Sequence, residues 1–133
     1  MANRAIRIER AARALVGVPF RLQGQCAQTG LDCVGLVQVA LAGAGCRAVA
    51  PDHYSVRGGR FAAFDQPLRQ AGLRPVRREK PGDIVLVQAG VAQFHLMIAV
   101  MGGHVHAHAG LGRVVEMPGA SPWPVIARWR WGR

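Results

Sequence analysis

Hydrophobic and polar positions follow two different periods along this chain of 133 residues. In residues 3–16, apolar side chains recur every three or four positions with arginines between them, and Gly17 and Pro19 follow. This spacing predicts an amphipathic helix that ends near Gly17. Residues 33–42 are apolar on every side except at Gln38, which predicts a helix buried at the centre of the protein.

Asp32 stands directly before the buried run and can cap it, because a carboxylate accepts hydrogen bonds from the N–H groups of a first helical turn. Residues 18–30, rich in Gln and Gly, predict a loop before this cap, and residues 50–60 predict a turn-rich connection after the helix. A short helix is predicted over residues 61–72, with three side chains turned inward: Phe61, Phe64 and Leu68.

The second half of the chain has the pattern of strands. Five short runs rich in β-branched and aromatic residues are separated by turn residues: 83–88, 94–101, 104–109, 113–117 and 125–131. The Gly102–Gly103 pair predicts a tight hairpin between the second and third runs. Helices followed by antiparallel strands indicate the α+β class, and we expect a single domain over residues 1–133, since neither a linker nor a repeat is visible.

Composition and charge narrow the classes of partner. Half of the residues are hydrophobic and 18% are charged, as in globular proteins, and no apolar run reaches the roughly 18 residues that span a bilayer. We therefore expect no membrane insertion. The N-terminal segment shows no uninterrupted apolar core of a signal peptide, so we expect synthesis in the cytoplasm.

The net charge of +10 favours an anionic partner, although a merely basic soluble surface explains it equally well. The arginines are scattered and not gathered with aromatic residues in one strip. This distribution argues against specific binding of nucleic acid.

Three cysteines, Cys26, Cys33 and Cys46, are too few and too irregularly spaced for a disulfide framework or a zinc site. Cys33 is the first residue of the predicted buried helix. Unpaired N–H groups and the helix dipole stabilise a negative charge at that position, which predicts a thiol pKa below its free value of about 8.5. Cys33 is therefore a candidate nucleophile.

A nucleophilic cysteine needs a base, and the strand region offers four histidines. His95 stands in an apolar run, where a lone histidine is more often structural. His104, His106 and His108 alternate along the next predicted strand and therefore share one face, which the predicted hairpin can bring next to His95. A cysteine, then a histidine, then a third polar residue is the chain order of papain-like cysteine peptidases.

Four stretches resemble the NlpC-type cell-wall peptidases, and most closely their phage and gene-transfer-agent tail members: "GVPFRLQGQ…TGLDCVGLV", "KPGDIVLV", "FHLMIAV" and "VHAHAGLGRVVE". The resemblance implies a papain-like fold with Cys33 as nucleophile, His95 as general base and His106 as the residue that orients it. His108 is the alternative third residue, and His104 stays open. The backbone N–H of Cys33 would donate to the oxyanion, next to the capping residue Asp32.

The chain departs from the family pattern at three positions and has an extra thiol near the site. Phe20 stands where the family usually has Tyr, Val34 replaces a common Ser, and Met97 replaces a common Gly. Neither the Val34 change nor the Met97 change removes a reacting group, whereas Phe20 lacks the tyrosine hydroxyl that the resemblance places near the oxyanion. Cys26 precedes the nucleophile closely enough for a reversible disulfide to be considered, with a bystander role as the alternative.

The resemblance implies a cysteine endopeptidase that hydrolyses the peptide stem of peptidoglycan, typically at a D-glutamyl–diaminopimelate bond. It also implies a place in a phage-like tail tip or baseplate, from which the enzyme would act on the wall in the periplasm. The alternative is a structural tail-tip protein that keeps the peptidase fold with little or no hydrolysis. No cofactor is expected. A metal site built on His104, His106 and His108 is a further alternative.

Overall fold

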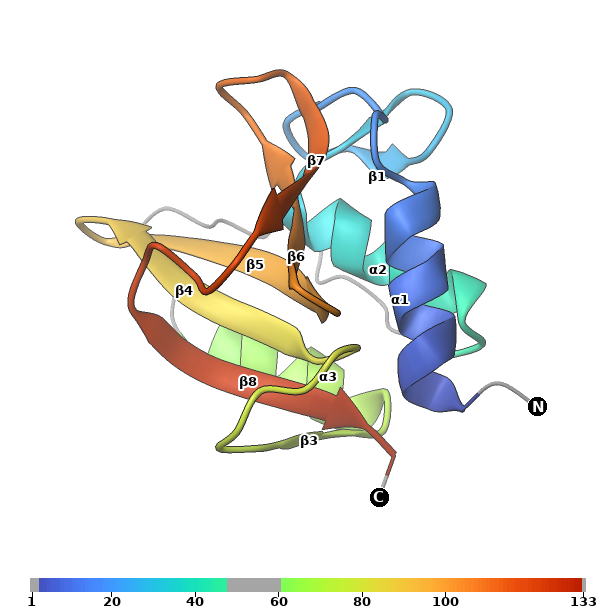
Figure 1. Ribbon diagram of the computed structural model, residues 1–133, viewed down its shortest axis with the longest axis vertical. Helices are drawn as coiled ribbons and strands as arrows, with labels where there is room; N and C mark the ends of the chain where they lie inside the picture. The colour runs from blue at the N-terminus through green and yellow to red at the C-terminus, as the bar shows by residue number, and fades with distance from the viewer. Residues whose placement is uncertain (1–2, 48–60, 133) are drawn as a thin grey trace.

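The computed structural model describes residues 3–47 and 61–132, which form three helices and eight strands (Figure 1). The helices are α1 (Arg4–Ala14), α2 (Cys33–Gly43) and α3 (Ala62–Gln70). The strands are β1 (Gln25–Cys26), β2 (Gly30–Leu31), β3 (Leu73–Pro75), β4 (Ile84–Gly90), β5 (Gln93–Val100), β6 (Gly103–His108), β7 (Arg113–Pro118) and β8 (Val125–Trp131). The predicted connection over residues 50–60 lies outside the described residues.

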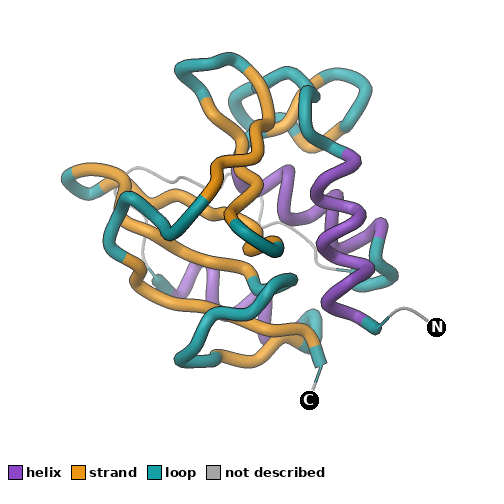
Figure 2. Tube along the Cα trace, in the orientation of Figure 1, coloured by secondary structure: helices purple, strands orange, loops and turns teal. Residues whose placement is uncertain are grey.

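Six strands form one antiparallel sheet in the order β3-β8-β4-β5-β6-β7, and β1 pairs with β2 in a separate ribbon (Figure 2). All five predicted runs are strands of the large sheet, so the predicted α+β class is confirmed. The short strands β1, β2 and β3 were not predicted, because two or three residues are too few to show a period. No helix in the described part of the chain is long and apolar enough to cross a bilayer.

The first two helices follow the predicted patterns. Ile8 and Ala12 bury the apolar stripe of α1, and the side chain of Asn3 accepts the N–H of Ile6 at its start. Most of α2 is buried, and it packs against α1 and against β5 and β6. The apolar sequence of α2 thus places its first residue, Cys33, inside the protein next to the sheet.

The third helix needs one correction. Phe64 and Leu68 are buried as predicted, but Phe61 is 43% exposed. Phe61 lies one position before α3 and stacks on Trp129 with 5.7 Å between ring centroids. The prediction that Phe61 turns into the core was wrong, because its ring lies on the outside of the buried Trp129 ring.

The sheet is apolar on both faces. The helices cover one face, where Ile84 and Leu86 of β4 meet Leu96 and Ile98 of β5 in the main core. The alternate residues of the same two strands form a second cluster on the other face, Val85, Val87, Met97 and Ala99, against which Trp123 packs. His95 pairs with Val87 across the strands, so alternation places its side chain on the second face.

The β5–β6 hairpin is confirmed, with a small shift of its turn. Val100 pairs with Gly103, so the two turn residues are Met101 and Gly102, and Gly102 has a φ of +82°. Gly103 belongs to β6, where a Cβ atom would overlap the backbone carbonyl of Met117. The second glycine therefore serves strand packing and not the turn.

Candidate active site

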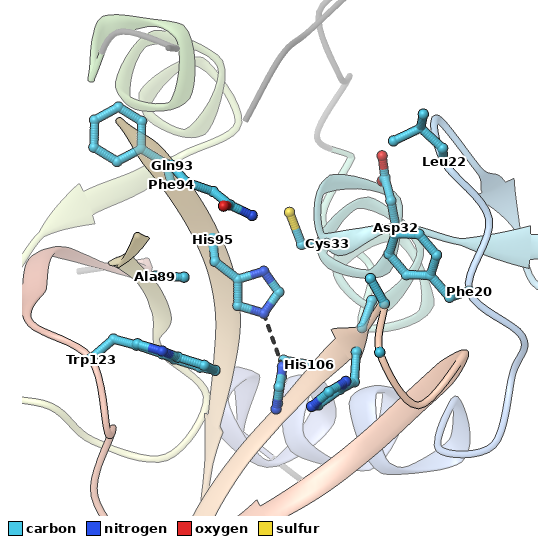
Figure 3. A pocket seen from close by; sticks show the side chains of 14 residues that line it. Phe20, Leu22, Asp32, Cys33, Ala89, Gln93, Phe94, His95, His106 and Trp123 are labelled. Carbon is cyan, nitrogen blue, oxygen red and sulfur yellow. Dashed lines mark hydrogen bonds between the residues drawn. The ribbon is translucent and has the colours of Figure 1, made fainter. Parts of the chain in front are cut away.

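Cys33, His95 and His106 line the same cavity of about 230 Å³ (Figure 3). Cys33 comes from the start of α2, His95 from β5 and His106 from β6. In Figure 3 the Cys33 sulfur lies on the side of the cavity that one nitrogen of His95 faces, while the other nitrogen points to His106. The structure therefore brings together the three residues that the sequence singled out.

The start of α2 is fixed by polar and backbone contacts. The Asp32 carboxylate accepts the N–H of Gly35 at 2.8 Å and the N–H of Gln23 at 3.1 Å, which confirms the predicted cap and ties the preceding loop to the helix. A Cβ atom on Gly35 would overlap the carbonyl oxygen of Gly24. The first turn of α2 thus packs directly on the loop backbone, which leaves no room for a side chain.

The two histidines meet because β5 and β6 separate. Their pairing covers only three residue pairs, Ile98–Val105, Ala99–His104 and Val100–Gly103, and does not continue toward His95. In the space between the diverging strands, Nε2 of His95 lies 2.9 Å from Nδ1 of His106. The two ring planes are nearly perpendicular, at 83°.

This hydrogen bond determines the tautomers of a working pair. To accept a proton from Cys33, His95 must have an unprotonated Nδ1, so its own proton is on Nε2 and is donated to Nδ1 of His106. His106 then carries its proton on Nε2. That atom is buried and has no hydrogen-bond partner among the described residues.

The predicted thiolate at Cys33 is wrong for the free site. Burial raises the pKa of the Cys33 thiol to about 12, and the neighbouring Asp32 carboxylate acts in the same direction. Backbone N–H groups, first among them that of Leu96, lower the pKa but do not outweigh burial. The helix terminus stabilises a thiolate, but Cys33 is only 3% exposed and the loss of water around it outweighs this effect.

Both histidines of the pair are neutral at physiological pH. Burial lowers the pKa of His95 to about 3, and the neighbouring His106 and His108 lower it further. Burial also lowers the pKa of His106 to about 4, with contributions from His108 and His104. The directions of these pKa shifts favour a thiol beside neutral imidazoles over a thiolate–imidazolium ion pair in the free site.

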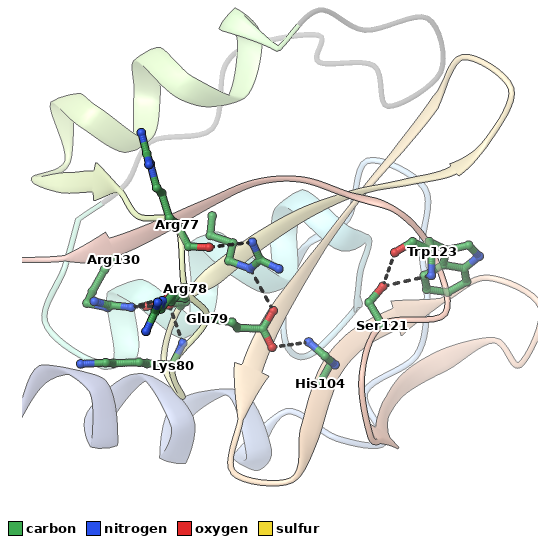
Figure 4. Close-up of polar contacts among 10 residues, drawn as sticks. Arg77, Arg78, Glu79, Lys80, His104, Ser121, Trp123 and Arg130 are labelled. Atoms are coloured by element: carbon green, nitrogen blue, oxygen red, sulfur yellow. Dashed lines mark hydrogen bonds and ion pairs between the residues drawn. The ribbon is translucent and has the colours of Figure 1, made fainter.

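The other two histidines of β6 have different surroundings. His104 Nε2 lies 2.8 Å from a carboxylate oxygen of Glu79, which also pairs with Arg128 (Figure 4). His108 lines the cavity, and its Nδ1 accepts the N–H of Leu111. Among the described residues, no three His, Cys, Asp or Glu side chains are grouped so that they could hold a metal ion, which leaves the alternative of a histidine metal site without support.

Two further residues of the cavity were missed by sequence reasoning. Trp123, from the β7–β8 connection, lies edge-to-face on His95 and on His106, each at 5.7 Å between centroids. Gln93, at the start of β5, lines the cavity near Cys33 (Figure 3). No local pattern marks either residue, although Trp123 stands between two prolines in "SPWPV".

Phe20 and the two other cysteines, Cys26 and Cys46, have different surroundings. Phe20, where the family resemblance expects Tyr, lines the cavity. Cys26 is exposed and free, and Cys46 is buried and free. Hydrogen bonds with Gln28 and Thr29 lower the pKa of the Cys26 thiol.

One known protein family matches most of the chain. The model of the NlpC/P60 family matches residues 17–123, a range that contains the loop, the helix and the strands of the cavity. The chain belongs to the NlpC/P60 family. No curated protein sequence matches the chain.

Solved structures of NlpC/P60 proteins share the fold, which confirms the predicted papain-like arrangement. NlpC2 from Trichomonas vaginalis is similar with a TM-score of 0.74 and 20% identity, over 98% of this chain and 47% of that chain. The chain thus spans about half the length of that protein. The NlpC/P60 domain of the peptidoglycan hydrolase SagA is similar with a TM-score of 0.61 and 22% identity, over 88% and 90% of the two chains.

One structural relative shows that this fold does not guarantee hydrolysis. RipD from Mycobacterium tuberculosis is described as a non-catalytic NlpC/P60 domain protein adapted to peptidoglycan binding. It is similar with a TM-score of 0.63 and 16% identity, over 98% of both chains. At these identities the likeness concerns the fold, and activity has to be argued from the residues of the cavity.

Proposed function

We propose that this NlpC/P60 protein is a cysteine endopeptidase that hydrolyses the peptide stem of bacterial peptidoglycan. The observation that carries the proposal is the shared cavity of Cys33, His95 and His106, with the 2.9 Å hydrogen bond between the two imidazoles. A nucleophile, a base and a group that orients the base are the parts that acyl transfer requires.

In the proposed reaction, the Cys33 sulfur attacks the scissile carbonyl carbon while its proton moves to Nδ1 of His95. The tetrahedral oxyanion forms near the start of α2, where the backbone N–H of Cys33 can donate to it. His95 then gives the proton to the leaving amine, and the C–N bond breaks. Water, deprotonated by His95, hydrolyses the acyl-enzyme and releases the free acid and the thiol.

The directions of the two pKa shifts support a proton transfer that accompanies bond formation. Burial raises the pKa of the Cys33 thiol and lowers that of His95, so the proton is proposed to leave sulfur as the carbon–sulfur bond forms. A thiolate–imidazolium pair would form before the attack only if the bound substrate lowered the pKa of Cys33 and raised the pKa of His95. His106 supports the transfer because its Nδ1 accepts a hydrogen bond from the Nε2–H of His95, which stabilises the imidazolium.

We infer that the bond cleaved joins D-glutamate to diaminopimelate, as the sequence resemblance implies. The net charge of +10 would hold the protein on an anionic wall, which affects association and not bond choice. The resemblance to tail-associated members further suggests a place in a phage-like tail tip or baseplate, with the protein made in the cytoplasm and acting in the periplasm.

Digestion of purified peptidoglycan, followed by mass spectrometry of the muropeptides, tests the proposal. Wild-type protein is expected to release stem fragments with a new D-glutamate carboxyl terminus, and Cys33→Ala is expected to release none. Exposed Cys26→Ala is the matched control and should digest like the wild type. Equal release by wild type and Cys33→Ala would overturn the mechanism, and cleavage at another position would overturn the bond assignment.

A second candidate function is a wall-binding or structural tail component without hydrolysis. Two observations favour it: Phe20 supplies no hydroxyl in the cavity, and RipD has this fold without catalysis. A zymogram together with a co-sedimentation assay separates the two functions. A binding protein leaves the peptidoglycan in the gel uncleared but sediments with insoluble peptidoglycan.

A further inference from the structure

Trp123 contacts both imidazoles of the site although it belongs to neither β5 nor β6. Its ring centroid lies 5.7 Å from that of His95 and 5.7 Å from that of His106, with interplanar angles of 78° and 81°. Together with the His95–His106 contact, these contacts make a closed triangle of three edge-to-face rings. We propose that Trp123 is the positioning residue of the imidazole pair, an inference that rests on the proposed peptidase function.

The pair needs such a residue because hydrogen bonding fixes only one side of His106. Its Nδ1 bonds to His95, but its Nε2 is buried without a hydrogen-bond partner among the described residues. A ring held at a single nitrogen can still tilt about that bond. The aromatic contacts of His106 are with His95, Trp123 and His108, and of these Trp123 also touches His95.

Hydrogen bonds fix the backbone of Trp123 in the β7–β8 connection (Figure 4). The Ser121 hydroxyl donates to the carbonyl of Trp123 at 2.8 Å and accepts its N–H at 3.1 Å. The next residue, Pro124, accepts the N–H of Gln88 at 3.0 Å, which attaches the connection to β4. The β4–β8 register shifts at this point, between Leu86 and Val87, so the chain can leave the sheet and turn the indole toward β5.

The indole acts on the pair in two ways. Packed against the cluster of Val85, Val87, Met97 and Ala99, it excludes water from the imidazoles and keeps them neutral at rest. When His95 accepts the Cys33 proton, the same contacts keep its Nε2–H directed at Nδ1 of His106, and this hydrogen bond stabilises the imidazolium. Trp123 thus preserves a neutral base before the reaction and stabilises its charged form during it.

Substitution of Trp123 by Ala and by Phe tests the proposal, with Trp131→Ala as the matched control. Trp131 lies against Arg4 and Arg7, away from the cavity. Trp123→Ala is expected to lower kcat/KM at least tenfold and to move the acid limb of the pH profile upward toward 6.5, because water reaches the imidazoles. Trp123→Phe should retain most activity, since a phenyl ring keeps the edge-to-face contact, and Trp131→Ala should match the wild type.

Nitrogen-15 NMR of the histidine rings gives a readout that does not depend on hydrolysis. In the wild type, His95 and His106 are each expected to show one neutral tautomer down to about pH 5. In Trp123→Ala the two tautomers should average and titrate at higher pH, and in Trp123→Phe they should not. Unchanged spectra together with an unchanged pH profile in Trp123→Ala would overturn the positioning role. An inactive wild type with the expected spectral changes would instead refute the peptidase and leave the positioning role intact.

Discussion

At the residue scale, Cys33 and Cys26 reverse the order of reactivity that their places in the sequence suggest. Cys33 heads a helix, yet burial raises its pKa to about 12. Cys26 lies in a short exposed strand, and hydrogen bonds with Gln28 and Thr29 lower its pKa. The proposed nucleophile is therefore the less acidic and less accessible thiol, while the exposed thiol of Cys26 is the more acidic one.

This reversal predicts the order of alkylation. At pH 7 and in the absence of substrate, iodoacetamide should modify Cys26 at least ten times faster than Cys33 or Cys46, because exposure and thiolate fraction both favour Cys26. Peptide mass spectrometry over a time course measures the three rates. Faster modification of Cys33 would mean that the free site holds a thiolate, contrary to the protonation states described above.

At the element scale, the position of α2 depends on two glycines that touch through their backbones. Gly35, in the first turn of α2, leaves no space for a side chain against the carbonyl of Gly24. The contact sets the distance between the loop and the helix, and thereby the depth at which Cys33 enters the cavity. The Asp32 cap fixes the same junction through its two hydrogen bonds.

We expect Gly35→Ala to lower the free energy of unfolding by about 2–3 kcal/mol, as for other overpacked positions, and to displace the start of α2. Gly43→Ala in the last turn of the same helix is the control. At Gly43 an added Cβ atom would lie 3.3 Å from the Cβ atom of Ala11. Because Ala has a better helix propensity than Gly, we expect the free energy of unfolding to change by less than about 1 kcal/mol. Urea denaturation measures both variants, and equal stability of the two would contradict the backbone contact.

The elements differ in how well the sequence predicts them. The helices at 4–14 and 33–43 and the five long strands were predicted because each buries one face or all faces over several periods. Phe61 was misplaced, since its stacking on Trp129 is a tertiary contact that the helical period does not record. Strand alternation predicted that one histidine of β6 meets His95, and the family resemblance selected His106. The gap between β5 and β6 and the contact with Trp123 depend on tertiary packing that no local pattern records.

At the scale of the whole molecule, two buried neutral histidines make folding sensitive to acid. In the unfolded chain these side chains titrate near their ordinary value of 6.5, whereas in the folded protein they titrate at about 3 and about 4. Between these values the unfolded state binds more protons than the folded state, so stability rises with pH. Their contribution is complete above about pH 6.5 and decreases steadily as the pH falls toward 4.

Thermal unfolding should therefore show a Tm that is nearly constant above pH 7 and falls by several degrees between pH 6.5 and pH 4. In His106→Gln the slope of Tm against pH in this window should be smaller, because one of the two groups no longer titrates. Differential scanning calorimetry measures both proteins. A Tm that stays level in the wild type down to pH 4 would show that the imidazoles are solvated in the folded state.

The short ladder between β5 and β6 has one more consequence. The N–H of Ala99 bonds toward β4, to the carbonyl of Asp83, so strand alternation turns the N–H of Leu96 toward β6. Since β6 has already diverged there, this donor is available to the Cys33 sulfur, whose pKa it lowers. If β5 and β6 paired over three more residue pairs, the sheet would be more regular, but the N–H of Leu96 would bond to β6 and not to the Cys33 sulfur. The chemistry of the site thus depends on hydrogen bonds that the sheet leaves unmade.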